Sequence, residues 1–552
     1  MSKYNYLQKY AKSRPWMPSI SSDTIRLART TVYAIQNQQE VSISMLESVV
    51  SLTYYFETLV ELLDNPILIE HCIIRLHKRE KEGVHIFDDE RGYLYFKIIV
   101  LSINTSMISK HHHSTVWDTL LSMHGRHDAA EELSDSLDDF LSERKGDPYP
   151  DKIIGWDSSD PRVLVISKKN SSLLLDLLFR DRKGLLKTCS QTWSPTLTGL
   201  LFVIWRCVYI TSTPECWVSF IDIARRCYLF TKADISSVIQ VFQEDAHRHW
   251  EQWLSRRTPT AMDLEDARLQ LSMLIERIRS EPGTGTNDVP FILSFYFLVT
   301  FSLPQVDEHF IPGVEDLFIP LLRECFRSFW RYFRFESGFA SVILRPDLMK
   351  DRIGILTIMI NLMLTHLFRH PTKVITMKQV LQAVADLGVV EILAKAVFFT
   401  NDYSGTNDIE KITEHFGTFK RFANSVRYIS QDGLGAVLRH TSTDWFKAYI
   451  FKEMQDAFFG TSTRHEEWFN ITINFWYELG ASLDYISPTV DYMRNIPLCS
   501  YTRCPDPVAT DMSALECACG QVVYCGVRCQ QLDWATYLPT SHRLNCSWSE
   551  VD

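Results

Sequence analysis

Cysteine is concentrated near the end of this chain. Of its 13 cysteines, seven lie between residues 499 and 546, and one histidine lies among them. Cysteine thiolates and histidine nitrogens are common zinc ligands in proteins, and a structural zinc site uses four of them. The eight candidate ligands therefore suffice for two zinc sites, and they are Cys499, Cys504, Cys517, Cys519, Cys525, Cys529, His542 and Cys546.

Zinc binding explains the cluster better than buried free cysteines or incidental clustering would. The tail has few aliphatic side chains and buries too little surface to fold alone, whereas zinc ligation contributes on the order of 10 kcal/mol to the folding of such modules. Four protein ligands leave no open position for water, so both ions are predicted to be structural. Spacing alone is compatible with an interleaved and with a sequential assignment of the ligands.

Two short segments of the tail combine several distinctive residue pairs. Residues 524–534 read YCGVRCQQLDW and residues 542–546 read HRLNC, so Tyr-Cys, Cys-Gln, Asp-Trp and His-x-x-x-Cys elements occur together. Together these elements resemble a MYND-type zinc finger across residues 499–546, under a tenth of the chain. A large helical body followed by such a finger is similar to a group of fungal MYND-finger proteins.

The resemblance implies that two Zn²⁺ ions take interleaved ligand sets. One ion would be bound by Cys499, Cys504, Cys525 and Cys529, and the other by Cys517, Cys519, His542 and Cys546. Three spacings depart from the family pattern: four residues follow Cys499 before Cys504, only Ala518 separates the next pair, and seven residues separate Trp534 from His542. Longer surface loops cost little entropy, so the tight Cys517–Cys519 spacing bears most on the second site.

The resemblance also implies a binding function. Fingers of this family bind short proline-containing peptides of partner proteins, and the corresponding contact residues here are Gln530 and Trp534. A tryptophan face can pack on a proline ring, and a glutamine amide can hydrogen-bond a peptide backbone. The alternative is that Trp534 only packs inside the finger. The sequence thus predicts an intracellular interaction or scaffold protein and not an enzyme.

Two other functional classes are less compatible with the sequence. A nucleic-acid-binding or transcription-associated finger needs a basic stripe to meet phosphates. Residues 499–546 instead hold three basic and four acidic side chains, and the whole chain carries a net charge of −10. A MYND-containing lysine methyltransferase would need the cofactor motif and the β-rich stretches of a SET domain, and we find neither.

The body that precedes the tail carries helical periodicity over most of residues 20–490. Apolar residues recur at three- and four-residue steps, which predicts helices with one buried face. Thr260-x-x-Asp263 resembles a capping box at the start of one such helix. The fold class is therefore predicted as mainly α. The two clearest periodic sets are Met45, Val49, Leu52, Phe56, Leu59 and Leu63, and Leu264, Ala267, Leu271, Leu274 and Ile278.

Breaks in this periodicity predict the domain organisation. We expect an N-terminal helical segment at 1–145, a linker at 146–163, a helical body at 164–496 and the finger at 497–552. Two helices that meet at Gly388, and a similar turn at Gly433, 45 residues later, have the spacing of armadillo or HEAT repeats. An armadillo/HEAT-like body and an irregular helical domain both remain compatible with the sequence.

Nothing in the sequence predicts secretion or a membrane span. The N-terminus lacks the apolar core of a signal peptide, and the apolar stretches 197–210 and 291–303 are shorter than a span requires. We expect both to be buried helices of an intracellular protein, with nucleus and cytoplasm both open. His366 and His370 have the spacing of a helical zinc pair but lack an intervening glutamate, so we interpret them as residues of a helix C-terminus.

Overall fold

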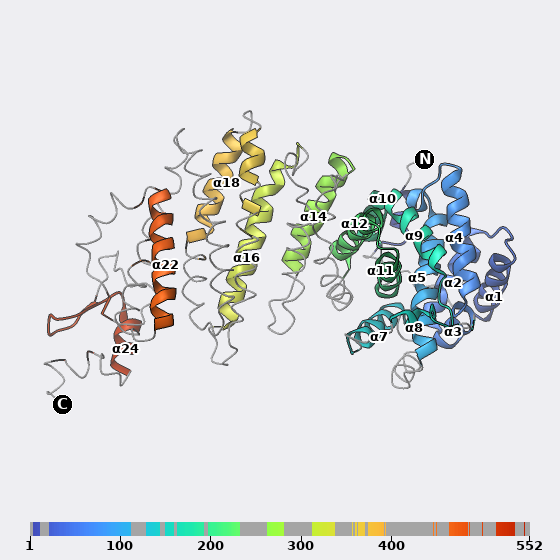
Figure 1. The fold of residues 1–552 in the computed structure, drawn as a ribbon, viewed down its shortest axis with the longest axis horizontal. Coiled ribbons are helices and arrows are strands. Elements are labelled where there is room, and N and C mark those ends of the chain that lie inside the picture. Colours follow the sequence, from blue (N-terminus) through green and yellow to red (C-terminus); the bar gives the residue numbers. More distant parts are fainter. Residues whose placement is uncertain are drawn as a thin grey trace. The chain divides into compact units, whose positions relative to one another are not determined.

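The computed structural model describes a large part of the chain, and helices dominate what it describes (Figure 1). The prediction of a mainly α fold is confirmed. The described strands are one antiparallel pair near the C-terminus. The described residues are 4–11, 21–111, 129–143, 150–158, 160, 163–192, 197–231, 262–280, 312–336, 356, 359–360, 363–369, 374–390, 392, 445, 449, 463–483, 485, 499–500, 515–535, 542 and 546.

The chain divides into two compact units. Unit 1 comprises Met1–Pro282 and Thr286–Val314, and unit 2 comprises Gly283–Gly285 and Glu315–Asp552. The described helices of unit 1 are η1 (Asn5–Gln8), α1 (Ser22–Gln36), α2 (Ile43–Val50), η2 (Ser51–Tyr54), α3 (Phe56–Leu63), α4 (Pro66–Lys81), η3 (Ile86–Asp88), α5 (Glu90–His111), α7 (Ala129–Glu143), α8 (Pro150–Ile154), α9 (Lys168–Arg180), α10 (Arg182–Gln191), α11 (Thr198–Thr211), α12 (Pro214–Phe230) and α14 (Leu264–Ser280).

Helix α5 lies at the centre of unit 1. It packs against α2, α3, α4, α7 and α11, and its residues from Tyr93 to Met107 are buried. A helix that is buried all round has no strong amphipathic period, so its small polar residues must find partners inside. Asn104 accepts a hydrogen bond from the amide of Gly199 at 3.2 Å. A side chain at Gly199 would collide with Asn104, so the close approach of α11 to α5 requires glycine there.

The periodic set at 45–63 forms one buried face, but on three short helices. Val49, Leu52, Phe56, Leu59 and Leu63 are buried, as predicted, and Met45 is half-buried. The helix is interrupted at η2 because Tyr55 leaves helical geometry, with φ −129° and ψ 78°. The local sequence is rich in β-branched and aromatic residues, which lose side-chain freedom in a helix.

The segment at 146–163 joins helices that pack within unit 1. It contains α8, where Ile154 is buried and Asp151 forms a two-pronged ion pair with Arg206 of α11, with N–O distances of 2.5 and 3.0 Å. The apolar helix at 197–210 is buried over most of its length, as predicted, although Tyr209 and Ile210 at its end are exposed. The second apolar stretch, at 291–303, lies outside the described residues. Among the described residues, no helix combines the length and the apolar character that crossing a membrane requires. The boundaries predicted for the domains stay predictions.

The sequence predicted Thr260 as the N-cap of α14, and this prediction is wrong. Asp263 itself caps the helix: its Oδ1 accepts a hydrogen bond from the amide of Asp266 at 2.9 Å, which satisfies one of the free N–H groups of the first turn. Thr260 lies outside the described residues. The predicted apolar face is buried at Ala267, Leu271, Leu274 and Ile278, whereas Leu264 in the first turn is exposed.

A buried ion network joins α10, α12 and α14. Arg226, which is buried to 0% exposure, donates to both carboxylate oxygens of Asp266 at 2.7 Å. Its Nε donates to Asp222 at 3.0 Å, and Asp222 also accepts from Arg225 at 2.6 Å and pairs with Arg182 at 3.2 Å. Because each charge has an oppositely charged partner, the desolvation of the buried groups is offset.

Asp181, between α9 and α10, is a buried carboxylate of a different kind. Its Oδ2 accepts a hydrogen bond from the amide of Phe87 at 2.7 Å, yet burial raises the pKa of Asp181 from 3.8 to about 6. A raised pKa means that the folded chain binds this proton more tightly than the unfolded chain does. The contribution of Asp181 to the free energy of unfolding is therefore most favourable below pH 4. It falls by up to about 3 kcal/mol as the pH rises through 6.

Replacing Asp181 with asparagine is expected to stabilise unit 1 at pH 7.5, by up to about 3 kcal/mol. The amide oxygen of Asn can still accept from Phe87 without a buried charge. The gain should shrink as the pH falls from 6 towards 4. Hydrogen exchange of amides in α9 and α10, compared between the variant and the natural chain at several pH values, measures it. Asp263→Asn is the control of opposite sign, because Lys183 lowers the pKa of Asp263. A gain that does not change with pH would contradict this account.

Unit 2 contains further helices and the strand pair. Its described elements are η5 (Glu315–Leu317), α16 (Phe318–Glu336), α18 (Val374–Asp386), α22 (Thr463–Ser482), β1 (Leu515–Glu516), β2 (Val523–Tyr524) and α24 (Val527–Ala535). The predicted break at Gly388 is confirmed: α18 ends at Asp386 and Gly388 takes a left-handed φ of +76°. The turn at Gly433 lies outside the described residues, so the repeat stays a prediction.

Two reciprocal hydrogen bonds between tryptophans connect α22 to Trp445. The indole of Trp445 donates to the carbonyl of Trp476 at 2.8 Å, and the indole of Trp476 donates to the carbonyl of Trp445 at 2.9 Å. Both side chains are buried. Gly480 lets this contact form, since a Cβ there would lie 2.3 Å from the Trp445 ring.

Candidate metal centre

The candidate ligands of the tail are positioned by a strand pair and one short helix. Strands β1 and β2 pair antiparallel, with Glu516 opposite Val523. Cys517 follows β1, and its amide donates to the carbonyl of Val522 at 2.9 Å. Gly520 then turns the chain with a φ of +71°, and its amide donates to the carbonyl of Cys517 at 2.8 Å. This tight turn places the sulfur of Cys519 near the sulfur of Cys517.

Strand β2 also holds the segment that carries Cys499. The amide of Ser500 donates to the carbonyl of Val523 at 2.7 Å, and the amide of Val523 donates to the Ser500 hydroxyl at 3.2 Å. Cys525 follows β2 directly, and Cys529 lies in the first turn of α24. The strand is therefore bordered on one side by β1 and on the other by the Cys499 segment.

The first group of candidate ligands comprises Cys517, Cys519, His542 and Cys546. Each offers one ligand atom, and the four atoms lie within 4.8 Å of one another. The sulfurs of Cys517 and Cys546 are 3.8 Å apart, and the Cys519 sulfur lies 3.2 Å from His542 Nε2. The two cysteines of the 517–519 pair therefore contribute to one group in spite of their tight spacing.

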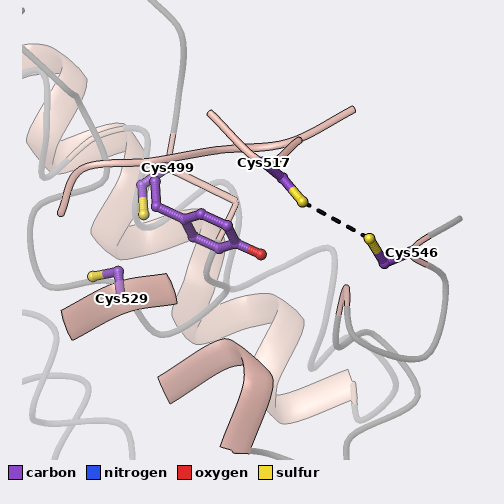
Figure 2. Packing of buried hydrophobic residues seen from close by; sticks show 5 residues of the cluster. Cys499, Cys517, Cys529 and Cys546 are labelled. Atoms are coloured by element: carbon purple, nitrogen blue, oxygen red, sulfur yellow. Dashed lines mark hydrogen bonds between the residues drawn. The ribbon is translucent and has the colours of Figure 1, made fainter. Parts of the chain in front are cut away.

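The second group comprises Cys499, Cys525 and Cys529, whose sulfurs also lie within 4.8 Å of one another. Cys525 and Cys529 are 3.4 Å apart, sulfur to sulfur. Cys504, the predicted fourth ligand of this group, lies outside the described residues. Figure 2 shows Cys499 and Cys529 close together, apart from Cys517 and Cys546.

These distances fit tetrahedral metal coordination. With metal–sulfur bonds of about 2.3 Å, ligand sulfurs in a tetrahedral site lie about 3.8 Å apart. The donors are thiols and one imidazole, which is the set that zinc takes in structural sites. The amide of Gln521 donates to the Cys519 sulfur at 3.4 Å. Burial would raise the pKa of Cys519, but this amide and the neighbouring thiols lower it, which favours the thiolate that a metal needs.

In the part of the tail that the structure describes, the fully buried core is made of cysteines and one aromatic side chain. Cys499, Cys517, Cys529, Cys546 and Tyr524 form one buried cluster. The Tyr524 hydroxyl donates to Asp533 Oδ2 at 2.9 Å, and the amide of His542 donates to the same oxygen at 3.0 Å. Burial and the Asp533 carboxylate raise the pKa of Tyr524, so its hydroxyl keeps the proton that it donates.

The two residues predicted to contact a peptide lie on α24. Gln530 and Trp534 are one turn apart, so they share a face of the helix, and both are half-buried. Trp534 packs against the buried cysteine cluster with part of its surface. The neighbouring Gln531 and Leu532 are exposed.

The grouping in the structure is the interleaved one that the family resemblance implies. Seven of the eight predicted ligands are brought into two groups, and Cys504 is not described. That these groups bind metal stays a prediction. Nothing in the sequence indicated that Tyr524 and Asp533 form the buried hydrogen bonds between the two groups. Both residues nevertheless belong to the Tyr-Cys and Asp-Trp elements on which the resemblance depends.

The histidines of the body take no part in a described metal group. His366 is buried on the segment that the sequence predicted as a helix C-terminus, and its Nε2 lies 3.3 Å from Glu315 Oε1. Its ring also contacts Phe318 edge-on, with centroids 5.8 Å apart. His370 lies outside the described residues, so the metal pair that the sequence argued against is not tested.

No family model matches this chain, and neither the curated proteins nor the solved structures contain a match. The class of the protein therefore rests on its own fold and site. It is a mainly α protein with two cysteine-rich groups near its C-terminus that could hold metal ions.

Proposed function

We propose that this is a zinc-binding interaction protein, with two structural Zn²⁺ ions that fold its C-terminal module. The observation that carries the proposal is the convergence of thiol and imidazole donors from distant positions into two groups of metal-binding size. Cys517, Cys519, His542 and Cys546 would hold one ion. Cys499, Cys525 and Cys529 would hold the other, with Cys504 as the fourth ligand.

We infer a structural and not a catalytic part for both ions. Four protein ligands in each site would leave no open position for a substrate or a water molecule. Zinc would supply cross-links between β1, β2, α24 and the segments around Cys499 and Cys546. The chain's own residues would then form a rigid surface, so we propose no enzymatic activity for this module.

The surface that we propose for partner binding is the face of α24 that carries Gln530 and Trp534. Its partners would be short proline-containing peptides, as the resemblance to MYND-type fingers implies. Trp534 packs on the cysteine cluster and its indole Nε1 is buried, but the residue as a whole is only half-buried, so we propose that its accessible part stacks on proline. The Gln530 amide lies one turn away and could hydrogen-bond the backbone of the same peptide.

Trp534→Ala in the zinc-loaded full chain is expected to weaken the binding of proline-containing peptides by about 2 kcal/mol or more, since aromatic anchors dominate interfaces of this kind. Gln530→Ala should weaken it by about 1 kcal/mol, the usual contribution of one hydrogen bond. Calorimetric titration of a panel of proline-containing peptides measures both changes.

Gln531→Ala is the matched control, because Gln531 is exposed on the same helix. It should leave peptide affinity unchanged. The zinc content of each variant must equal that of the natural chain, so that unfolding of the module does not account for lost binding. Equal affinities of the natural chain and Trp534→Ala, or no binding of any proline-containing peptide, would refute the peptide-binding proposal and leave the zinc proposal intact.

A further inference from the structure

A single buried carboxylate lies between the two groups of candidate ligands. Asp533 is 2% exposed, and its Oδ2 accepts two hydrogen bonds, from the Tyr524 hydroxyl at 2.9 Å and from the His542 amide at 3.0 Å. His542 belongs to the group of Cys517, and Tyr524 directly precedes Cys525 of the Cys499 group. One oxygen atom thus links the two groups.

Helix α24, which carries Asp533, also carries Cys529 of the Cys499 group. Cys529 and Asp533 are four residues apart on α24, on the same side of the helix. Drawing Cys529 and Cys525 towards Cys499 would fix α24 and β2 relative to one another. Fixing α24 also fixes Asp533 Oδ2, the oxygen to which the His542 amide donates its hydrogen bond.

Asp533 acts on His542 through its backbone. The imidazole of His542 lies 3.2 Å from the Cys519 sulfur, while its backbone amide donates to Asp533 Oδ2 at 3.0 Å. A hydrogen bond to the backbone of a ligand residue orients that ligand, and residues that orient ligands in this way typically change metal affinity by about 10- to 100-fold when replaced.

Resting on the proposed zinc function, we propose that Tyr524 and Asp533 are positioning residues that couple the two metal groups. Metal binding by Cys499, Cys525 and Cys529 orders Asp533, and ordered Asp533 holds His542 in place for the group of Cys517. The coupling is reciprocal, because two linked binding equilibria affect each other by the same factor. The two ions are therefore bound and released together by the natural chain.

The test uses the full chain loaded with Co²⁺, whose absorption reports thiolate and imidazole ligation. With Cys504 as fourth ligand, one group is all-thiolate and the other contains an imidazole, so their spectra differ. A chelator is titrated in, and the loss of each spectrum is followed. The natural chain should lose both in one transition.

Asp533→Ala should split the transition, with Co²⁺ leaving the group of Cys517 first, at a chelator concentration about 10- to 100-fold lower, because this group loses the orientation of His542 as well as the coupling. Tyr524→Phe keeps the ring in the core and leaves Asp533 with the His542 amide as a donor, so it should split the single transition with a smaller shift. Asp533→Asn retains an oxygen that can accept both bonds and should restore most of the affinity. Gln531→Ala is the exposed control on α24 and should behave like the natural chain.

The outcomes separate this inference from the proposed function. A natural chain that binds no Co²⁺ would overturn both. A natural chain that loses two bound ions in two separate transitions, or an Asp533→Ala variant that still loses both in one transition, would overturn the coupling alone. A single transition that moves to lower chelator concentration is what a merely structural residue would cause, and a split transition that Asp533→Asn makes single again is what a positioning residue causes.

Discussion

Chelation of the bound metal is expected to unfold β1, β2 and α24 while the helices of unit 1 stay folded. The expected loss is on the order of 10 kcal/mol, the contribution of structural zinc to small modules. The reason lies in the composition of the module's core: among the described residues, its buried cluster consists of Tyr524 and cysteines, and Leu515, Val522 and Trp534 pack against it only partly buried. Without metal, these thiols offer little apolar area to offset the loss of chain entropy. Hydrogen exchange of the full chain, before and after chelation, measures the effect.

Zn²⁺ added back should restore amide protection in β2 and α24, and Mg²⁺ should not, because it prefers oxygen ligands. Cys546→Ser should reproduce the chelated state in the module. Cys72→Ser is the matched control, since Cys72 is a buried free cysteine of α4 in unit 1. It should leave the module unchanged. Protection of β2 and α24 that survives exhaustive chelation would disprove the metal-dependent fold.

The candidate site could be predicted from the sequence because its residues have unusual types and sit close together in the chain. Density of cysteine identified the ligands, but their distribution between two groups came from family resemblance, since spacing is compatible with more than one pairing. The structure adds why the grouping works: β2 pairs with β1 on one side and with Ser500 on the other. That arrangement brings Cys517 and Cys499 to different ends of one small core.

The helices were predictable where apolar residues recur with one period, as at Ala267, Leu271 and Leu274. The interruption at Tyr55 was not, because the apolar period continues through it and only local backbone preference ends the helix. Asp138 of α7 shows that the burial of single charged residues is not predictable from such patterns either, because it is buried although most carboxylates are exposed.

The ion network of unit 1 could not be predicted from the sequence. Arg226 and Asp266 are 40 residues apart, and charged residues along a helix are exposed in most proteins. Only the packing of α12 against α14 brings them together. Sequence patterns indicate which face of a helix is apolar. They do not indicate which charged residues of two helices come into contact when the helices pack.

Arg226→Met is expected to destabilise unit 1 by about 3–5 kcal/mol, the cost of leaving a buried charge without its partner. Burial acts to raise the pKa of Asp266, but Arg226 outweighs it and holds that pKa below its usual value. The natural carboxylate therefore contributes stability at neutral pH that is lost only as the pH falls through its depressed pKa. Without Arg226, burial would raise the pKa of Asp266, so the deficit of the variant should be largest at pH 7 and shrink towards pH 4.

Hydrogen exchange of amides in α12 and α14 is the measurement, because a chain with two units has no single free energy of unfolding. The double variant Arg226→Met, Asp266→Leu should recover much of the loss, since an apolar pair often replaces a buried ion pair at little cost. Lys183→Met, which removes a more exposed pair with Asp263 and Glu265, should cost less than about 1 kcal/mol. If Arg226→Met costs no more than Lys183→Met, the network does not hold α12 to α14, and their apolar contacts alone must do so.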